Sequence, residues 1–178
     1  MISESNMAVD TTPIRPAPDG PVLPFELTTF LAGPSSAWGV FEDRFGKLRR
    51  RFTIELLGRW QDEVFHLEEQ FTYDDGMRET RVWHVTPTGN GRFTATCADC
   101  VGTAHGTCDA DTIRMAYRFR LKIDAREINV DFDDRIYRIG DGVAVNRASM
   151  SKWGVKLGQV SLFFRRDDAI TKDDRAVA

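Results

Sequence analysis

The stretch "TIRMAYRFRLKI" at residues 112–123 alternates apolar and polar side chains without a break. A period of two, rather than 3.6, predicts a β-strand with one face against a core and the other in water. At about 3.3 Å per residue the strand would span roughly 40 Å, a length that suits the tilted wall of a closed barrel better than a sandwich. The side chains expected to point inward are Ile113, Met115, Tyr117, Phe119, Leu121 and Ile123.

Short apolar runs with turn residues between them recur over residues 25–166, and long helical patterns are nearly absent. The expected fold is therefore all-β, a single antiparallel up-and-down β-barrel of the lipocalin or calycin kind with roughly eight to ten strands. Residues 1–24 and 167–178 are rich in polar residues and show no apolar periodicity, so we expect a disordered N-terminal arm and C-terminal tail.

Two hairpins are predicted in enough detail to give a register. A two-residue loop at residues 125–126 would set Leu121 opposite Val130 on the dry face and Arg118 opposite Asp133 on the wet face.

The second hairpin turns at "DDG", where a three-residue loop with Gly76 in the left-handed conformation is a common geometry. This loop sets Glu69 opposite Arg81 and Leu67 opposite Trp83, with all four side chains on the inner face.

The segments "SSAWGVFEDRFGKL" and "SMSKWGVKLGQVSL" share a Trp-Gly-Val step near the two ends of the chain. In an up-and-down barrel the first and last strands are hydrogen-bonded neighbours. We therefore expect Trp38-Gly39 and Trp153-Gly154 to precede these two strands and cap one end of the barrel. The alternative is two unrelated dipeptides on loops.

The net charge of −3 and the interleaving of acids with bases leave no basic surface for nucleic acid. No apolar run approaches the length of a membrane span, and the N-terminal segment has neither the basic start nor the apolar stretch of an export signal, so we expect a cytoplasmic protein. In that setting the three cysteines are not expected to form structural disulfides.

Five segments in order resemble a bacterial family known as domain of unknown function 3833. They are "FLAGPSSAWGVFEDRFGKLRRRF", "EEQFTYDDGMRETRVWHV", "ADCVGTAHG", "DFDDRIY" and "VNRASMSKWGVKLGQVSLFFR". The resemblance implies a lipocalin-like barrel with no established activity, of a kind often encoded beside enzymes that modify membrane fatty acids. Many members look like lipoproteins with an export signal and an acylated cysteine, and this chain departs from that pattern in both respects.

Cys97, Cys100, His105 and Cys108 are a candidate metal site, because their ligand types suit tetrahedral zinc. The last spacing is shorter than in a zinc knuckle, and His105 and Cys108 would project to opposite faces of a strand. We therefore expect no metal and no cofactor, and small thiols packed in or near the barrel wall.

Glu69 and Arg81 would both face the apolar interior, where a charge is costly unless it is paired. Either the two form a buried ion pair that fixes the hairpin register, or Arg81 binds the polar head of a ligand whose tail lies on the aromatic residues. Either Asn146 or Arg147 must also face inward. The candidate ligand-binding residues are Glu69, Phe71, Tyr73, Arg81, Trp83, Tyr117, Phe119 and Asn146.

His66 and His84 fall on the opposite, outer face, and "KLRRRF" reads as the solvated face of the first strand, with weak peripheral contact to anionic lipid as the alternative. The favoured function is non-enzymatic binding of a hydrophobic, fatty-acyl or lipid-like molecule. The alternatives are a barrel enzyme using Glu69, Tyr73 or His105 for proton transfer, and a solid-cored scaffold for a protein partner. The ligand's identity and the oligomeric state are left open.

Overall fold

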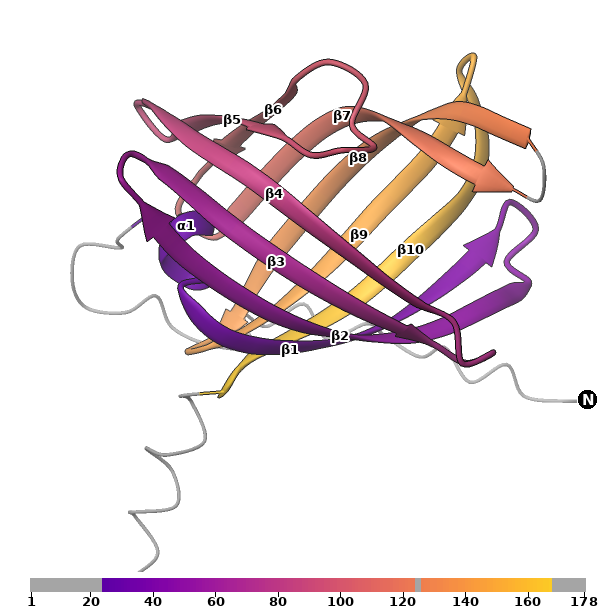
Figure 1. Cartoon of the computed structure of the whole chain (residues 1–178), viewed down its shortest axis with the longest axis horizontal. Coiled ribbons are helices and arrows are strands. Elements are labelled where there is room, and N and C mark those ends of the chain that lie inside the picture. Colours follow the sequence, from indigo (N-terminus) through magenta and orange to yellow (C-terminus); the bar gives the residue numbers. More distant parts are fainter. Residues whose placement is uncertain (1–23, 124–125, 168–178) are drawn as a thin grey trace, which may run out of the picture.

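The computed structural model describes residues 24–123 and 126–167. Within them, ten antiparallel strands close into one barrel in which β1 pairs with both β2 and β10 (Figure 1). This confirms the all-β closed barrel expected from the alternating pattern. The elements are α1 (Leu27–Phe30), β1 (Gly33–Asp43), β2 (Leu48–Gln61), β3 (Val64–Tyr73), β4 (Arg78–Gly89), β5 (Arg92–Thr96), β6 (Ala104–Cys108), β7 (Thr112–Ile123), β8 (Arg126–Gly140), β9 (Val143–Lys152) and β10 (Val155–Arg166).

The β3–β4 hairpin has the predicted register, with Glu69 opposite Arg81 and Leu67 opposite Trp83. Its loop is closed by the amide of Tyr73, which donates to the carbonyl of Met77, and Gly76 has a φ of 82°. Glycine adopts this left-handed conformation without the steric cost that a Cβ adds, which is why the "DDG" sequence turns the chain here.

The register predicted for β7 and β8 was wrong by two residues. Leu121 pairs with Ile128 rather than Val130, and Arg118 pairs with Asp131, to which its Nε donates at 2.8 Å. The turn comes one residue earlier than expected, because Ile123 already pairs with Arg126. A shift of two keeps the predicted faces, so the inner residues Ile113, Met115, Tyr117, Phe119 and Leu121 still lie in the core or pack against it.

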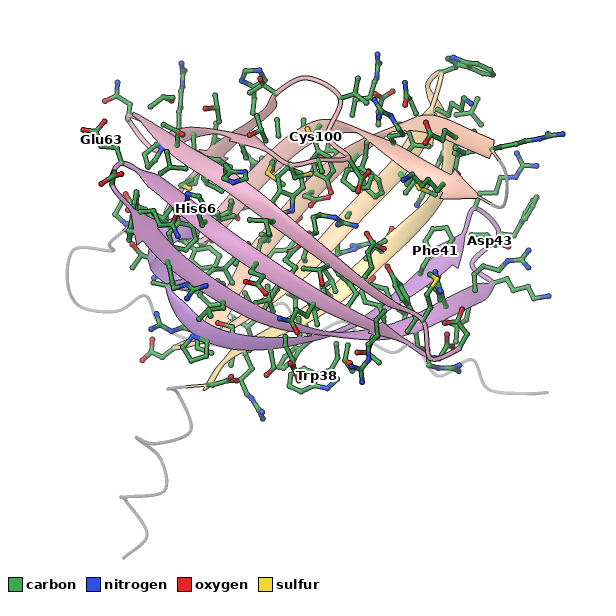
Figure 2. All side chains as sticks on the ribbon, in the orientation of Figure 1. Trp38, Phe41, Asp43, Glu63, His66 and Cys100 are labelled. Atoms are coloured by element: carbon green, nitrogen blue, oxygen red, sulfur yellow. The ribbon has the colours of Figure 1, made fainter. Side chains whose placement is uncertain are left out.

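The first and last strands pair, as expected, but the two Trp-Gly steps do not cap one end. Trp38 lies in the middle of β1 opposite Phe163 of β10, and its ring projects outside the barrel, 41% exposed (Figure 2). Trp153 lies in the β9–β10 turn at a φ of 52° and is 89% exposed. Trp153-Gly154 does precede the last strand, because β10 begins at Val155. The expectation failed for Trp38-Gly39, because β1 begins at Gly33 and this step falls inside the strand.

One end of the barrel is closed by the chain that precedes β1, seen at the left of Figure 1. Phe25, Leu27, Phe30 and Leu31 are all buried there, and the Phe30 ring meets Phe164 edge-on at 6.4 Å. The carbonyl of Leu31 comes so close to Gly58 of β2 that a Cβ there would overlap its oxygen. A short helical turn thus acts as the floor of the barrel.

The disordered arm and tail expected at residues 1–24 and 167–178 lie almost entirely outside the described residues. In the part of the chain that is described, no helix has the length and apolarity needed to cross a membrane.

Substituting Gly58→Ala should lower the free energy of unfolding by about 2 kcal/mol or more, because the added methyl group meets a backbone carbonyl that cannot rotate away. Gly140→Ala is the matched control, since a Cβ at Gly140 of β8 would meet nothing within 4 Å. Urea unfolding of both variants measures the difference. Equal effects of the two substitutions would mean that the floor does not pack against β2.

Candidate functional site

The barrel encloses a cavity of about 490 Å³, a size typical of small-molecule sites. Leu27 and Leu31 of the floor line one end, and Phe41, Arg49 and Lys122 line the other, where β1 and β7 end and β2 begins. Figure 2 places Phe41 and Asp43 at this second end, which we call the mouth. The wall between the two ends is mostly aliphatic and aromatic.

Aromatic rings form a continuous wall on β4, β7 and β8. Trp83 meets Tyr117 edge-on at 5.2 Å, and Tyr117 stacks on Phe132 at 5.2 Å with an interplanar angle of 12°. Phe119 meets Phe132 edge-on at 6.1 Å. These geometries are the ones that aromatic pairs prefer, so the wall is held by its own packing.

Arg81 is the centre of a charged cluster on β3 and β4. Its guanidinium lies 2.7 Å from the Glu79 carboxylate and 3.8 Å from that of Glu69, and the Tyr73 hydroxyl donates to Glu79 at 2.9 Å. The guanidinium carbon also lies 4.5 Å from the centre of the Phe119 ring. Arg81 therefore already has two carboxylates and an aromatic face as partners.

Burial governs the ionisation of this cluster. It raises the pKa of Glu69, against the charge of Arg81 and a hydrogen bond from Trp83, which both lower it. Burial and the neighbouring Glu79 raise the pKa of Tyr73 well above its usual range. Burial lowers the pKa of Arg81, but Glu69 and Glu79 outweigh that effect and hold it above its ordinary value.

A second polar group, on β7, β8 and β9, consists of Tyr117, Asp134 and Asn146. The Tyr117 hydroxyl donates to Asp134 Oδ2 over a long 3.4 Å. Burial raises the pKa of Asp134 to about 7, although hydrogen bonds from Asn146 and Tyr117 oppose the shift. Asp134 Oδ1 and Asn146 Oδ1 are buried and have no hydrogen-bond partner among the described residues.

A family model described as "Protein of unknown function (DUF3833)" matches residues 19–166. The chain belongs to this family. A search of curated proteins found no match.

Among solved structures, this DUF3833 barrel is similar to the S-type phycobiliprotein lyase CPES from Guillardia theta, with 9% identity and a TM-score of 0.57 over 79% of this chain and 90% of the lyase. It is also similar to a DUF3598 protein of unknown function from Nostoc punctiforme, with 13% identity and a TM-score of 0.55 over 84% of this chain and 53% of that longer chain. At these identities the likeness shows the fold alone.

All eight residues proposed from the sequence line the same cavity of this DUF3833 protein. Of the two neighbours on β9, it is Asn146 that faces inward, since Asn146 is buried and Arg147 is exposed. That these residues bind a ligand remains a prediction.

Asp134 and Glu79 were not among the residues proposed from the sequence. The signal for Asp134 was present, because the alternation that puts Val130 and Phe132 inward also puts Asp134 inward. Glu79 lies two residues before Arg81 on the same face of β4, where its carboxylate reaches the guanidinium. Both acids were overlooked because an inward-facing charge departs from the apolar pattern by which the inner face is found.

None of the cysteine and histidine residues lines the cavity. His105 is exposed on β6, and His66 and His84 pair on the outer face of β3 and β4 with ring centres 4.6 Å apart. Cys97, Cys100 and Cys108 are partly buried free thiols. Across residues 24–123 and 126–167, no group of three or more His, Cys, Asp or Glu side chains is arranged to hold a metal ion.

The basic run "KLRRRF" enters β2, which begins at Leu48, rather than the first strand. Its arginines lie near acids at the ends of the neighbouring strands and in the β3–β4 turn. Arg49 pairs with Asp43 at 2.6 Å and Arg50 with Asp75 at 2.7 Å. These pairs compensate much of the positive charge at the mouth.

Asp134→Asn tests the burial of this carboxyl group through the pH dependence of stability. Because the folded-state pKa lies near 7, above the ordinary value of 3.8, the fold loses stability as the pH rises from about 4 to about 7. At pH 8 the variant should be more stable than the wild type by about 1–4 kcal/mol, and the difference should vanish near pH 4.

The matched control is Asp133→Asn, because Asp133 is the exposed neighbour of Asp134 on β8. It should leave the pH profile close to that of the wild type. Chemical unfolding at pH 4, 6 and 8 measures all three proteins. If the difference in free energy of unfolding between wild type and Asp134→Asn does not change with pH, the raised pKa of Asp134 is contradicted.

Proposed function

We propose that this protein binds an apolar small molecule, of a fatty-acyl or other lipid-like kind, inside the barrel and without covalent chemistry. The observation that carries the proposal is the cavity of about 490 Å³, walled by aliphatic and aromatic side chains with few polar groups. Pockets with this composition enclose most of a ligand's surface and use their few polar groups to orient it.

The driving force would be burial of the ligand's hydrocarbon surface. Each buried methylene group contributes about 0.8 kcal/mol, so a chain of about ten carbons gains roughly 8 kcal/mol before the costs of association. The wall is held in place by its own aromatic contacts, which keeps the cost of ordering side chains on binding low.

The lipid-like character is supported by what the family resemblance implies, a place beside enzymes that modify membrane fatty acids. The similarity to a phycobiliprotein lyase supports a barrel of this shape and carries no inference about a shared ligand.

The alternatives are less well supported. A solid-cored scaffold is hard to reconcile with the cavity. An enzyme would need a proton-transfer group in the cavity, and His105 lies exposed on the outer wall. Tyr73, with its raised pKa, would give up a proton only well above neutral pH, and Glu69 lies beside Arg81.

Binding can be measured with N-phenyl-1-naphthylamine, a neutral probe whose fluorescence rises in apolar surroundings. The wild type should bind it with micromolar affinity, and Ala148→Phe should weaken binding about tenfold or more, because Ala148 is a buried residue of the cavity lining and the larger ring would fill the space.

Ala116→Phe is the control, since Ala116 is exposed on the outer face of β7 and the same substitution there leaves the cavity open. Thermal melts of both variants show whether the fold is kept. A wild type that fails to bind the probe, or an Ala148→Phe variant that is folded and binds it normally, would refute binding inside the barrel.

A further inference from the structure

Two buried oxygen atoms that lack a hydrogen-bond partner in the described part of the chain lie in the wall of the cavity. Asp134 is 7% exposed and Asn146 is 4% exposed, and both residues line the cavity. Asp134 Oδ1 and Asn146 Oδ1 receive no hydrogen bond from the described residues. Leaving a buried acceptor unsatisfied costs about 1–3 kcal/mol. A ligand group that donates a hydrogen bond to these atoms would recover that free energy on binding.

Carboxyl groups outnumber cations in and beside this part of the wall. Arg81 is the cation of the charged cluster, with Glu69 and Glu79 as its acidic partners, and Asp134 adds a third carboxyl group. The charge of Glu69 itself raises the pKa of Asp134. The other cations of the cavity lining, Arg49, Arg50 and Lys122, lie toward the mouth. Close to Asp134 and Glu69 a further anion would therefore meet repulsion, and a cation or a neutral donor would not.

Arg81 is poorly placed to bind a carboxylate head group. Its Nη atoms already face Glu79 at 2.7 Å and Glu69 at 3.8 Å, so a ligand carboxylate would be the third on one guanidinium. Its buried Nε has no partner among the described residues and can donate one further hydrogen bond, for instance to a hydroxyl or carbonyl oxygen.

The surroundings of Asp134 suit a positively charged or N–H-bearing group. The Tyr117 ring, whose hydroxyl donates to Asp134, stacks on Phe132 and meets Trp83 at 5.2 Å. Aromatic faces attract cations, and they attract them more strongly in a site from which water is excluded. Acceptor oxygens and aromatic faces thus occur together in one part of the wall.

We infer that the cavity selects apolar ligands that carry an N–H or O–H donor, and a protonated amine above all, at Asp134 and Asn146, and that it discriminates against free carboxylic acids. This inference rests on the proposed binding function and narrows it. Instead of a ligand carboxylate bound by Arg81, it predicts a ligand hydrogen-bond donor bound by Asp134 of β8 and Asn146 of β9.

A series with one chain length and four head groups tests the inference. Decylamine, 1-decanol, methyl decyl ether and decanoate are titrated at pH 8 as competitors of N-phenyl-1-naphthylamine. The amine should compete at least tenfold better than decanoate, and the alcohol about fivefold better than the ether, which has the oxygen but no donor.

The Asp134→Asn variant removes the charge with little change in shape. It should weaken the amine about tenfold or more relative to the alcohol, the scale of a hydrogen bond to a charged group. Asp133→Asn, the same change on the outer face of β8, should leave all four affinities unchanged. Asn146→Leu is the second variant, and it should abolish the preference of the alcohol over the ether.

The outcomes separate the inference from the proposed function. If neither the probe nor any of the four ligands binds the wild type, the binding function itself fails. If they bind but decanoate competes as well as the amine, the inference is overturned and the binding function stands. The inference is likewise overturned, with binding intact, if the ratio of amine to alcohol affinity is unchanged in a folded Asp134→Asn protein.

Discussion

The hydrogen-bonded ladder between β1 and β10 is the contact on which the rest of the structure depends. It runs from the pair Ser35–Arg166 to the pair Asp43–Gly158 and turns an open sheet into a barrel without edges. Closure at this strand number has a geometric consequence, because barrel diameter grows with the number of strands and about eight already give an interior that side chains can fill. A larger ring of strands leaves space inside, and the cavity occupies that space.

The polarity of the barrel interior changes along the barrel axis. The floor made by α1 is apolar, and the charged and amide groups lie farther along the strands. Near the mouth, Arg49 pairs with Asp43 and Arg50 pairs with Asp75. A polar group in the middle of the barrel is the expensive arrangement, since it loses water without gaining a full set of partners. A polar group at the rim would avoid that cost.

Much of this architecture follows from the period of two in the sequence. Alternation sorts side chains to the inner and outer faces whatever the register, which is why the eight proposed residues share one cavity although the β7–β8 pairing was off by two. The floor could not be predicted, because a four-residue helix is too short to show a period. β1 was overlooked because its inward positions include Ser35 and Gly39, which carry no apolar signal. The ion pairs of Arg81 depend on side-chain reach, which alternation does not encode.

Burying the carboxyl group of Asp134 costs folding free energy. The polar groups of the cavity are therefore better explained by ligand binding than by stability of the fold. A leucine in place of Asp134 would pack against the aromatic wall and remove a buried charge, a change that commonly stabilises proteins. An ion pair that fixes register would need a cation as its partner, whereas the hydrogen-bond partners of Asp134 are Tyr117 and Asn146, both neutral. A carboxyl group that is buried, held by neutral partners and facing open space is poorly explained by stability. It is well explained if the space is filled by a molecule that completes its hydrogen bonds.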